Sequence, residues 1–393
     1  MKLIRSGRRA LVCFVAGVAA LLGGTTSALL GTCGPFTDTA NDAFCPFVLE
    51  VFYLGITTGT TATTYDPTSN VSRTQMAAFL SRGVDGVLKR GSRRAALNRF
   101  WTTQNPSTLG VTTVGGAPRL VQSDGLDVWV GNNFDGTVSR VRGSDTRLLE
   151  TWTGATGAYG VLTAMNRVLV TGQIDPGRLY LIDPSQTAGA VTTVATNLGT
   201  GPSGIAFDGA RVWTANLTPT GSISIITPGA IPWTVTTLSV GVGSTAPIGA
   251  LYDGANIWVT DHGLGALVKL NNSGAVLQTV TIGGTPGFPI FDGANIWVPN
   301  NGSTSVAVVR ASTGSILQTL SGNGLDGPLS AAFDGERVLI TNFTGNSVSL
   351  WKAADLTPLG TFLTGPMTSP DGACSDGSSF WITLVNAQEL ARF

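Results

Sequence analysis

The sequence is poor in charge and almost lacks histidine. Lysine, arginine, aspartate and glutamate make up 12% of its 393 residues, and the formal net charge is zero. A nucleic-acid-binding protein normally carries a basic balance, so no nucleic-acid partner is expected. The single histidine, His262, excludes a histidine-rich zinc site and leaves one candidate for histidine-dependent catalysis. The residues alone therefore indicate no cofactor, no metal site and no catalytic cluster.

Long hydrophobic runs are also scarce. The N-terminus has one, Ala10–Gly24, which is shorter than the ~20 residues that a membrane-spanning helix needs. Basic residues precede it, and the small residues Thr26-Ser27-Ala28 follow, which is the layout of a secretory signal peptide. We interpret residues 1–28 as such a signal and expect no transmembrane span after cleavage. A retained membrane anchor is the alternative.

The sequence has few cysteines, and we expect them to have different structural roles. Of the four, Cys13 would leave with the signal peptide. Cys33 and Cys45 are close in sequence and would enter an oxidising compartment, so we predict a disulfide between them. Cys374 lies in a strand pattern without an evident partner, and we expect a small buried apolar side chain there.

Residues 33–82 predict a small module of two short helices around a loop. The segment from Phe44 to Leu54 has helical periodicity, and Ser72 has the position of an N-cap before a second apolar face. The module resembles the S-layer homology (SLH) domain in four segments: Phe36-x-Asp38, Leu54-Gly55-Ile56-x-x-Gly59, Tyr65-x-Pro67 and Val71-Ser72-Arg73-Thr74-Gln75.

The resemblance implies attachment to the cell envelope. The expected partner is a pyruvylated wall polysaccharide or peptidoglycan, and the family pattern assigns contact with the acidic glycan to Arg73. The alternative is that Arg73 is a solvated residue in the first turn of a helix. This sequence departs from the pattern in having Ser72 for threonine, Gln75 for glutamate, and one module where the family commonly has three.

Residues 83–109 are predicted to connect the module to the rest of the chain. They hold the only basic cluster after the signal segment: Lys89, Arg90, Arg93, Arg94 and Arg99. The cluster is either a contact with an anionic wall polymer or a solvated face.

The remaining residues, 110–393, repeat a short frame that begins Asp-Gly. The frame occurs six times, with a degenerate seventh copy at Ala164: Asp124, Asp208, Asp253, Asp292, Asp334 and Asp376. From Asp124 to Asp376 the frames span 252 residues in six intervals, a mean of 42. A proline stands six residues before every frame except the degenerate one, which has Ala158. This regularity indicates one structural unit used seven times.

A period near 42 residues with four strands in each unit is typical of a β-propeller blade. The last unit ends after three strands, and Gly110–Val114 can supply the fourth from the other end. We therefore predict an all-β fold, a seven-bladed β-propeller preceded by a small α-helical module and a signal peptide. This part of the chain resembles bacterial propellers of the YVTN, NHL and streptogramin-lyase-like group.

The repeated residues have structural interpretations. Asp-Gly is a favoured hairpin turn because both positions accept positive φ. The tryptophan of the frame is expected to fill the space between blades, and an Asn or Asp three residues later to bond the backbone of the following turn. A ligand site is instead expected among the variable residues at the opposite end of the inner strands. The candidates are Arg119, Asn133, Tyr159, Asp261, His262, Asn301 and Asp371.

Together these features favour an exported bacterial cell-envelope protein. The SLH-like module would attach it to the wall, and the propeller would serve as a binding or scaffolding platform, with another envelope protein as a candidate partner. One alternative is a propeller enzyme like the streptogramin lyases, acting through His262, although that resemblance implies more than one histidine together with Glu and a divalent metal. The other is a purely structural surface-layer component.

Overall fold

The computed structural model describes residues 33, 35–39, 44–53, 56–83, 110–217, 221–240 and 246–393. The predicted signal peptide, 1–28, and residues 84–109 of the predicted connector lie outside this set. The chain divides into two units, Met1–Gly91 and Ser92–Phe393, which we describe separately. None of the described helices is long and apolar enough to cross a membrane.

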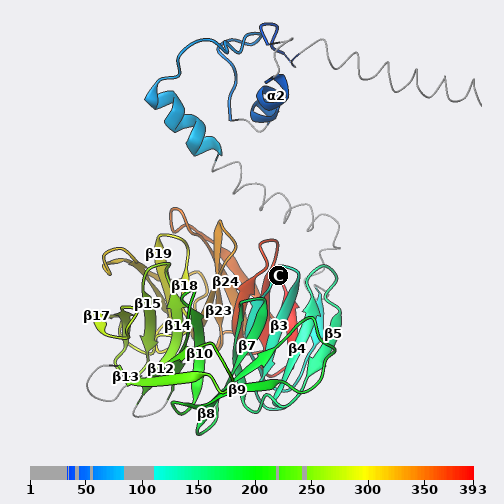
Figure 1. Ribbon diagram of the computed structural model, residues 1–393. Coiled ribbons are helices and arrows are strands. Elements are labelled where there is room, and N and C mark those ends of the chain that lie inside the picture. Colours follow the sequence, from blue (N-terminus) through cyan, green and yellow to red (C-terminus); the bar gives the residue numbers. More distant parts are fainter. Residues whose placement is uncertain are drawn as a thin grey trace, which may run out of the picture. The chain divides into compact units, whose positions relative to one another are not determined.

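The second unit is a seven-bladed β-propeller, as predicted (Figure 1). Each blade is a four-stranded antiparallel sheet. Blade 1 comprises β2 (Pro118–Ser123), β3 (Asp127–Asn132), β4 (Thr137–Arg142) and β5 (Leu148–Trp152). Blade 2 comprises β6 (Ala158–Ala164), β7 (Arg167–Gly172), β8 (Gly177–Ile182) and β9 (Thr192–Leu198). Blade 3 comprises β10 (Pro202–Phe207), β11 (Val212–Asn216), β12 (Ser222–Thr227) and β13 (Thr234–Ser239). Blade 4 comprises β14 (Pro247–Tyr252), β15 (Ile257–Asp261), β16 (Ala266–Leu270) and β17 (Val276–Thr281).

The other three blades continue the same order. Blade 5 comprises β18 (Ile290–Phe291), β19 (Asn295–Asn300), β20 (Ser305–Arg310) and β21 (Ile316–Ser321). Blade 6 comprises β22 (Pro328–Phe333), β23 (Arg337–Asn342), β24 (Ser347–Lys352) and β25 (Pro358–Leu363). Blade 7 comprises β26 (Pro370–Ser375), β27 (Phe380–Leu384), β28 (Glu389–Arg392) and β1 (Val111–Thr113). In every blade the strand named first is the inner strand, nearest the propeller axis.

The ring is closed by a strand from the other end of the propeller sequence. Strand β1 pairs antiparallel with β28, with Val111 opposite Ala391 and Thr113 opposite Glu389. Val114, which follows β1, is buried with Val121 of blade 1 and Trp381 of blade 7. The predicted donor segment Gly110–Val114 therefore completes the last blade.

Blade 5 is the irregular blade. Its inner strand β18 is two residues long, and Pro286 makes only an isolated bridge to Asn300. The cause lies in the sequence Pro286-Gly287-Phe288-Pro289, because proline lacks the N–H that a strand ladder needs. Phe288 instead bridges to Ser330 in the inner strand of blade 6.

The Asp-Gly turns form as predicted, but the explanation that both positions take positive φ is wrong. Positive φ occurs at the glycine alone, as at Gly125 (93°). The aspartate is held by its side chain instead: Asp124 Oδ1 accepts hydrogen bonds from the backbone N–H groups of Leu126 and Asp127 at 2.9 and 2.8 Å. Only the degenerate copy has two positive φ values, at Met165 and Asn166.

The same aspartates also anchor the buried tryptophans. In five blades the aspartate Oδ2 accepts a hydrogen bond from the indole Nε1, at 2.7–2.8 Å: Asp124–Trp129, Asp208–Trp213, Asp253–Trp258, Asp292–Trp297 and Asp376–Trp381. Each indole lies in a core shared with the next blade, as predicted, and Leu169 and Leu339 fill the same place in blades 2 and 6. One residue thus fixes both the turn and the interblade packing.

The asparagine column has other partners than we expected. Asn132, Asn216 and Asn342 donate from Nδ2 to two hydroxyl groups of the next strand, at 2.8–3.0 Å. The other two members of the column are Asp261 and Asn300. Only Asp261 bonds the following turn, where its Oδ1 accepts from the Leu264 N–H at 3.0 Å, whereas the Asn300 side chain bonds Gly283 and Thr285 before its own strand. The side chain therefore ties strand to strand more often than strand to turn.

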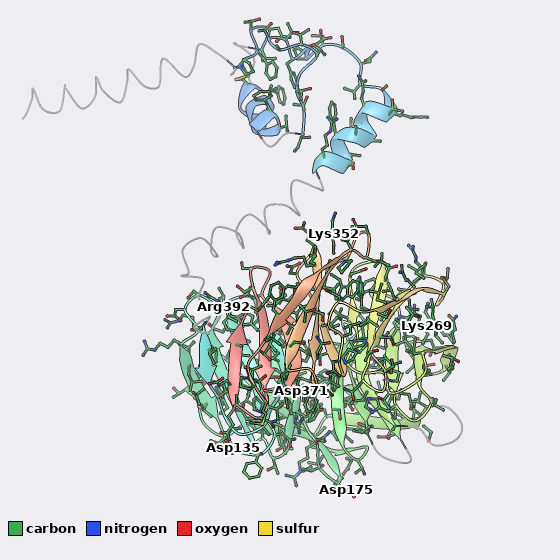
Figure 2. The ribbon with its side chains drawn as sticks, turned by 180° about the vertical axis from the view of Figure 1, so that it is seen from behind. Asp135, Asp175, Lys269, Lys352, Asp371 and Arg392 are labelled. Atoms are coloured by element: carbon green, nitrogen blue, oxygen red, sulfur yellow. A yellow bond between two sulfur atoms is a disulfide. The ribbon has the colours of Figure 1, made fainter. Side chains whose placement is uncertain are left out.

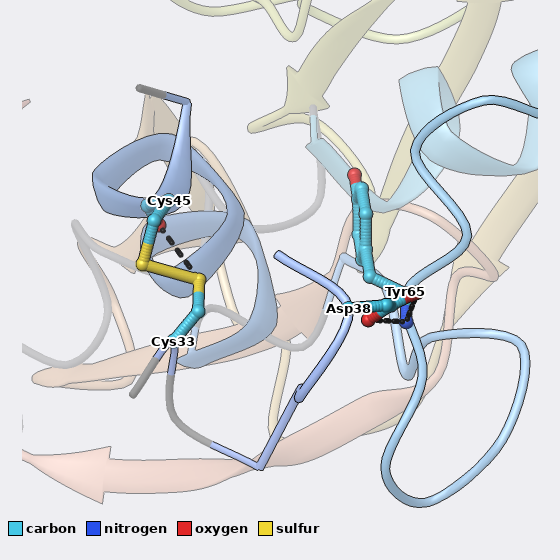
Figure 3. The surroundings of a disulfide bond; sticks show 4 residues. All are labelled: Cys33, Asp38, Cys45 and Tyr65. Atoms are coloured by element: carbon cyan, nitrogen blue, oxygen red, sulfur yellow. Dashed lines mark hydrogen bonds between the residues drawn. A yellow bond between two sulfur atoms is a disulfide. The ribbon is translucent and has the colours of Figure 1, made fainter. Parts of the chain in front are cut away.

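The first unit contains the SLH-like module. It has helix α2 (Cys45–Tyr53), a loop and a second helical segment, residues 73–83. Cys33 and Cys45 form a disulfide, with their Cα atoms 5.6 Å apart (Figure 3). Cys33, Phe36 and Val48 make a small buried core against which Phe52 and Tyr65 pack.

Candidate functional site

Most residues of the SLH-like pattern have structural roles in the module. The Phe36 ring lies 5.1 Å from the Phe52 ring and 5.5 Å from the Tyr65 ring, centroid to centroid. Gly59 has a positive φ of 76°, and a Cβ atom there would collide with Phe36. Only glycine fits this position, because it combines left-handed backbone with close approach of an aromatic ring.

Asp38 is also structural. Its carboxylate accepts a hydrogen bond from the backbone N–H of Tyr65, at 2.9 Å (Figure 3). It accepts another from the backbone N–H of Asp66, at 2.7 Å. These bonds favour the charged form, so they hold the pKa of Asp38 below its usual value. The contact fastens the segment after Cys33 to the loop before the second helical segment.

Arg73 is placed by a capping box. Ser72 Oγ accepts from the Gln75 N–H at 3.2 Å, and Gln75 Oε1 accepts from the Ser72 N–H at 2.8 Å. Serine and glutamine can fill these two positions as threonine and glutamate do, so the departures from the family pattern preserve the helix start. Arg73 follows in the first turn with its side chain exposed.

In the propeller, the structure brings three of the predicted candidates together. Arg119, Tyr159 and Asp371 each follow the Pro or Ala that opens an inner strand, in blades 1, 2 and 7. Arg119 Nη1 lies 2.9 Å from Asp371 Oδ2, and the Arg119 Cζ lies 5.6 Å from the Tyr159 ring centroid. Asp371 lies inside the propeller, toward the end that carries Asp135 and Asp175, and away from Lys352 and Arg392 (Figure 2).

These residues belong to a cluster across the propeller axis. The Tyr159 ring lies 6.1 Å from the Phe288 ring of blade 5. Blades 2 and 5 are not neighbours in the ring, so their contact must cross the axis. Arg119, Asp371 and Tyr159, with the apolar residues Ile248, Phe288 and Leu329, are called the axial cluster below.

The other candidates are not part of this cluster. Asp261 is fully buried, and its Oδ1 accepts from two backbone N–H groups. Asn301 donates from Nδ2 to the Gly327 carbonyl at 3.1 Å and so bridges two blades, and Asn133 is half-buried. These side chains have local structural partners or no shared geometry with Arg119.

His262 lies at the same end of blade 4 and is half-buried. Burial lowers its pKa, against the opposing effects of Asp261 and a hydrogen bond with the Pro286 backbone. Within the described ranges, no group of three or more His, Cys, Asp or Glu residues could hold a metal ion. Among the described residues, His262 is therefore not part of a metal-binding group.

A set of threonines that the sequence analysis missed positions the axial residues. Thr383 Oγ1 accepts from the Gly372 N–H at 2.8 Å and donates to the Arg119 carbonyl at 2.6 Å. Thr341 Oγ1 donates to the Asp371 carbonyl at 2.8 Å in the same way. Each of these threonines lies two residues after the Trp or Leu of the repeated frame, so the sequence alone could have shown this further repeated position. Its members are Thr171, Thr260, Thr341 and Thr383.

A hollow also exists at the Asp-Gly end of the propeller, which the sequence did not single out. It measures about 210 Å³ and lies between blades 3 and 4. Its lining includes Asp208, Arg211, Tyr252 and Asn272. Asp208 and Arg211 pair with each other at 3.0 Å, so the two charged groups of the lining already have partners.

Comparisons with known proteins separate the two units. Residues 35–77 match the model of the S-layer homology domain. The propeller is similar in structure to virginiamycin B lyase from Staphylococcus aureus, with a TM-score of 0.61 at 14% identity over 72% of this chain and 98% of that one. No curated protein matched the sequence.

Other structural neighbours have different names. Kuenenia stuttgartiensis hydrazine synthase has a TM-score of 0.61 at 14% identity over 75% of this chain and 98% of that one. The WD40 β-propeller domain of Doa1 has a TM-score of 0.59 at 14% identity, covering 72% and 95%. Because unrelated functions share this fold, the likeness shows the propeller architecture and nothing about its activity.

Proposed function

We propose that the protein is exported and held at the cell envelope by its SLH module, and that the propeller is a binding platform displayed there. The observation that supports attachment most directly is the SLH match at residues 35–77, with Arg73 in the motif position. Phe36, Asp38, Gly59 and Ser72 all serve the module's own structure. Arg73 is the exposed charged residue of the motif that is left for recognition.

The chemistry of the proposed contact is ion pairing. An acidic wall glycan presents carboxylate or phosphate oxygens, and arginine donates paired hydrogen bonds to such groups. The capping box fixes the first helical turn, so Arg73 projects from a rigid position instead of a mobile loop. Because the side chain is exposed, the contact should weaken as salt is added.

Sedimentation with purified cell-wall sacculi tests the attachment. The chain without residues 1–28 is expected to pellet with the wall, and Arg73→Ala should weaken binding roughly tenfold or more, as for loss of a charged hydrogen-bonding group. Arg82→Ala is the matched control: it lies on the same helical segment, but its Nη1 donates to the Ile56 carbonyl at 3.3 Å. Equal binding by all three proteins, or none by the parent, would overturn the proposal.

A lyase-like activity is the second candidate function. It is favoured by the structural likeness to virginiamycin B lyase, for which a catalytically inactive histidine-to-alanine variant with quinupristin is a further neighbour. In this chain the role could fall only to His262. Incubation with quinupristin and a divalent metal should give a His262-dependent product under this hypothesis, and no conversion would eliminate it.

A further inference from the structure

The axial cluster is divided into a polar and an apolar half. Blades 7, 1 and 2 contribute Asp371, Arg119 and Tyr159, whereas blades 4, 5 and 6 contribute Ile248, Phe288 and Leu329. Leu120 and Leu217 pack against the cluster of Tyr159, Ile248 and Phe288 and are only partly buried. One end of the axis thus combines a guanidinium with a set of partly exposed leucines.

Arg119 is held in one orientation. Its Nη1 is bonded to Asp371 Oδ2 at 2.9 Å, and its Cζ lies 5.6 Å from the Tyr159 ring centroid, within cation–π range. The Arg119 side chain is 29% exposed, whereas that of Asp371 is 1% exposed. The aspartate therefore supports the arginine from within, and part of the arginine side chain faces solvent.

The pair is not a satisfied structural ion pair. Asp371 Oδ1 and Arg119 Nε are buried and have no hydrogen-bond partner among the described residues. Buried polar atoms without a partner are rare and costly in folded proteins. Well-packed apolar side chains often stabilise a buried position at least as well as an ion pair does. The polar pair thus calls for a role beyond packing.

The charge of the cluster restricts the ligand. Asp371 balances Arg119, and the remaining residues of the axial cluster are uncharged at neutral pH. Because the pair has no net charge, a second anion beside the buried Asp371 carboxylate would leave a net negative charge in a poorly solvated place, which is unfavourable. A cation would meet the exposed arginine.

We propose that the axial cluster binds an uncharged, largely apolar molecule through a carbonyl oxygen. The carbonyl of an amide or ester accepts a hydrogen bond from the Arg119 guanidinium, and the apolar body packs on Leu120, Leu217 and Leu329. The inference deepens the platform role of the propeller and rests on it. It assigns recognition to Arg119 and a positioning role to Asp371 and Tyr159.

Three probes with the same side chain test the charge requirement. N-acetyl-leucine amide is neutral, N-acetyl-leucine is an anion and leucine amide is a cation at neutral pH. Titration of the whole chain, followed by NMR of the probe, should show saturable binding of the neutral compound. The anion and the cation should bind at least about tenfold more weakly, given the size of charge–charge interactions near a protein surface.

Asp371→Asn is the decisive variant because it keeps the shape of the side chain and removes its charge. The anion should gain roughly tenfold in affinity, while the neutral probe changes little. Asp127→Asn is the matched control: Asp127 pairs with Arg140 Nε at 2.7 Å, and Arg140 lies 5.0 Å from the Trp129 ring centroid, but outside the axial cluster. It should leave all three affinities unchanged.

A milder variant keeps the test valid if Asp371→Asn does not fold. Leu329→Ala, at a partly buried position, should weaken the neutral probe about threefold through lost apolar contact. No binding of the neutral probe, or equal binding of all three, overturns the inference. So does an unchanged anion-to-neutral ratio in folded Asp371→Asn. If the same preparations still pellet with sacculi, the envelope role survives that failure; if the parent does not pellet, the envelope role fails by itself.

Discussion

The SLH module is stabilised by a few unlike contacts, whereas the propeller is stabilised by the same contacts repeated around a ring. In the module, the Cys33–Cys45 disulfide, the Phe36 ring and the Asp38 carboxylate each occur once. In the propeller, the bond from an aspartate to a buried indole occurs in five blades. This difference predicts in which unit a single substitution should cost more stability.

Repetition allows substitution at a single copy. Leu169 and Leu339 occupy the place of the tryptophan in two blades and are fully buried there. In blade 6 the aspartate Asp334 binds Arg337 at 2.7 Å instead of an indole. Among the described residues of the module, none of these contacts has a second copy that could compensate, so its residues are less replaceable. In the ring, the closure by β1 is likewise made only once.

Breaking the closure should therefore have the largest effect. A chain that begins at Gly115 lacks β1 and Val114, and so loses the outer strand of blade 7 and one buried apolar side chain. We expect the propeller to lose roughly 3–5 kcal/mol of stability, from the missing ladder bonds and the lost burial.

The control for the closure is a chain that begins at Gly110 and retains the donated strand. Thermal unfolding followed by tryptophan fluorescence reports on the propeller, because these two chains contain the eight tryptophans that follow residue 110 and lack Trp101. Coincident transitions for the two chains would show that β1 does not hold the ring together.

Removing the disulfide should have the next largest effect, confined to the module. Cys33→Ser with Cys45→Ser opens a bridge between residues 12 apart in sequence, and such bridges contribute about 2–4 kcal/mol. Circular dichroism at 222 nm follows the module's helices and should show an earlier transition, with tryptophan fluorescence unchanged. Cys374→Ala, in the buried free thiol of blade 7, is the control that must leave the module's transition in place.

The fold was predictable because a repeat multiplies weak signals. One Asp-Gly turn or one proline says little, but seven copies at a period near 42 placed the blades and the closing strand. The turn geometry was predicted for the wrong reason, since the backbone preference of Asp-Gly ignores the carboxylate. In the structure, Asp124 Oδ1 caps two N–H groups, and that interaction decides the turn.

The candidate site was only partly predictable. The candidates were chosen by position, and that choice included Arg119 and Asp371, which are 252 residues apart and meet only because blade 1 lies beside blade 7. The sequence did not show that Tyr159 would lie under the arginine, or that Phe288 would reach across the axis, since these depend on side-chain directions in an irregular blade 5. The threonine column was visible and was overlooked.

The smallest expected effects give the most direct comparison of the module with the propeller. One substitution in each unit should remove a similar amount of folding free energy. Ser72→Ala removes the N-cap of the second helical segment and should cost about 1 kcal/mol. Asp253→Asn keeps the size of the side chain but removes the carboxylate that accepts from the Trp258 indole at 2.7 Å, a loss of about 1–2 kcal/mol.

The two losses should nonetheless shift the unfolding temperatures unequally. The shift per kcal/mol falls with the size of the cooperative unit, about 4–8 °C for a small domain and about 2–4 °C for one of 150–250 residues. We expect Ser72→Ala to move the 222 nm transition by several degrees and Asp253→Asn to move the fluorescence transition by less. Ser72→Asp should restore the cap and the transition. An equal or larger shift in the propeller would mean that its blades unfold as separate small units, so that repetition does not protect the ring.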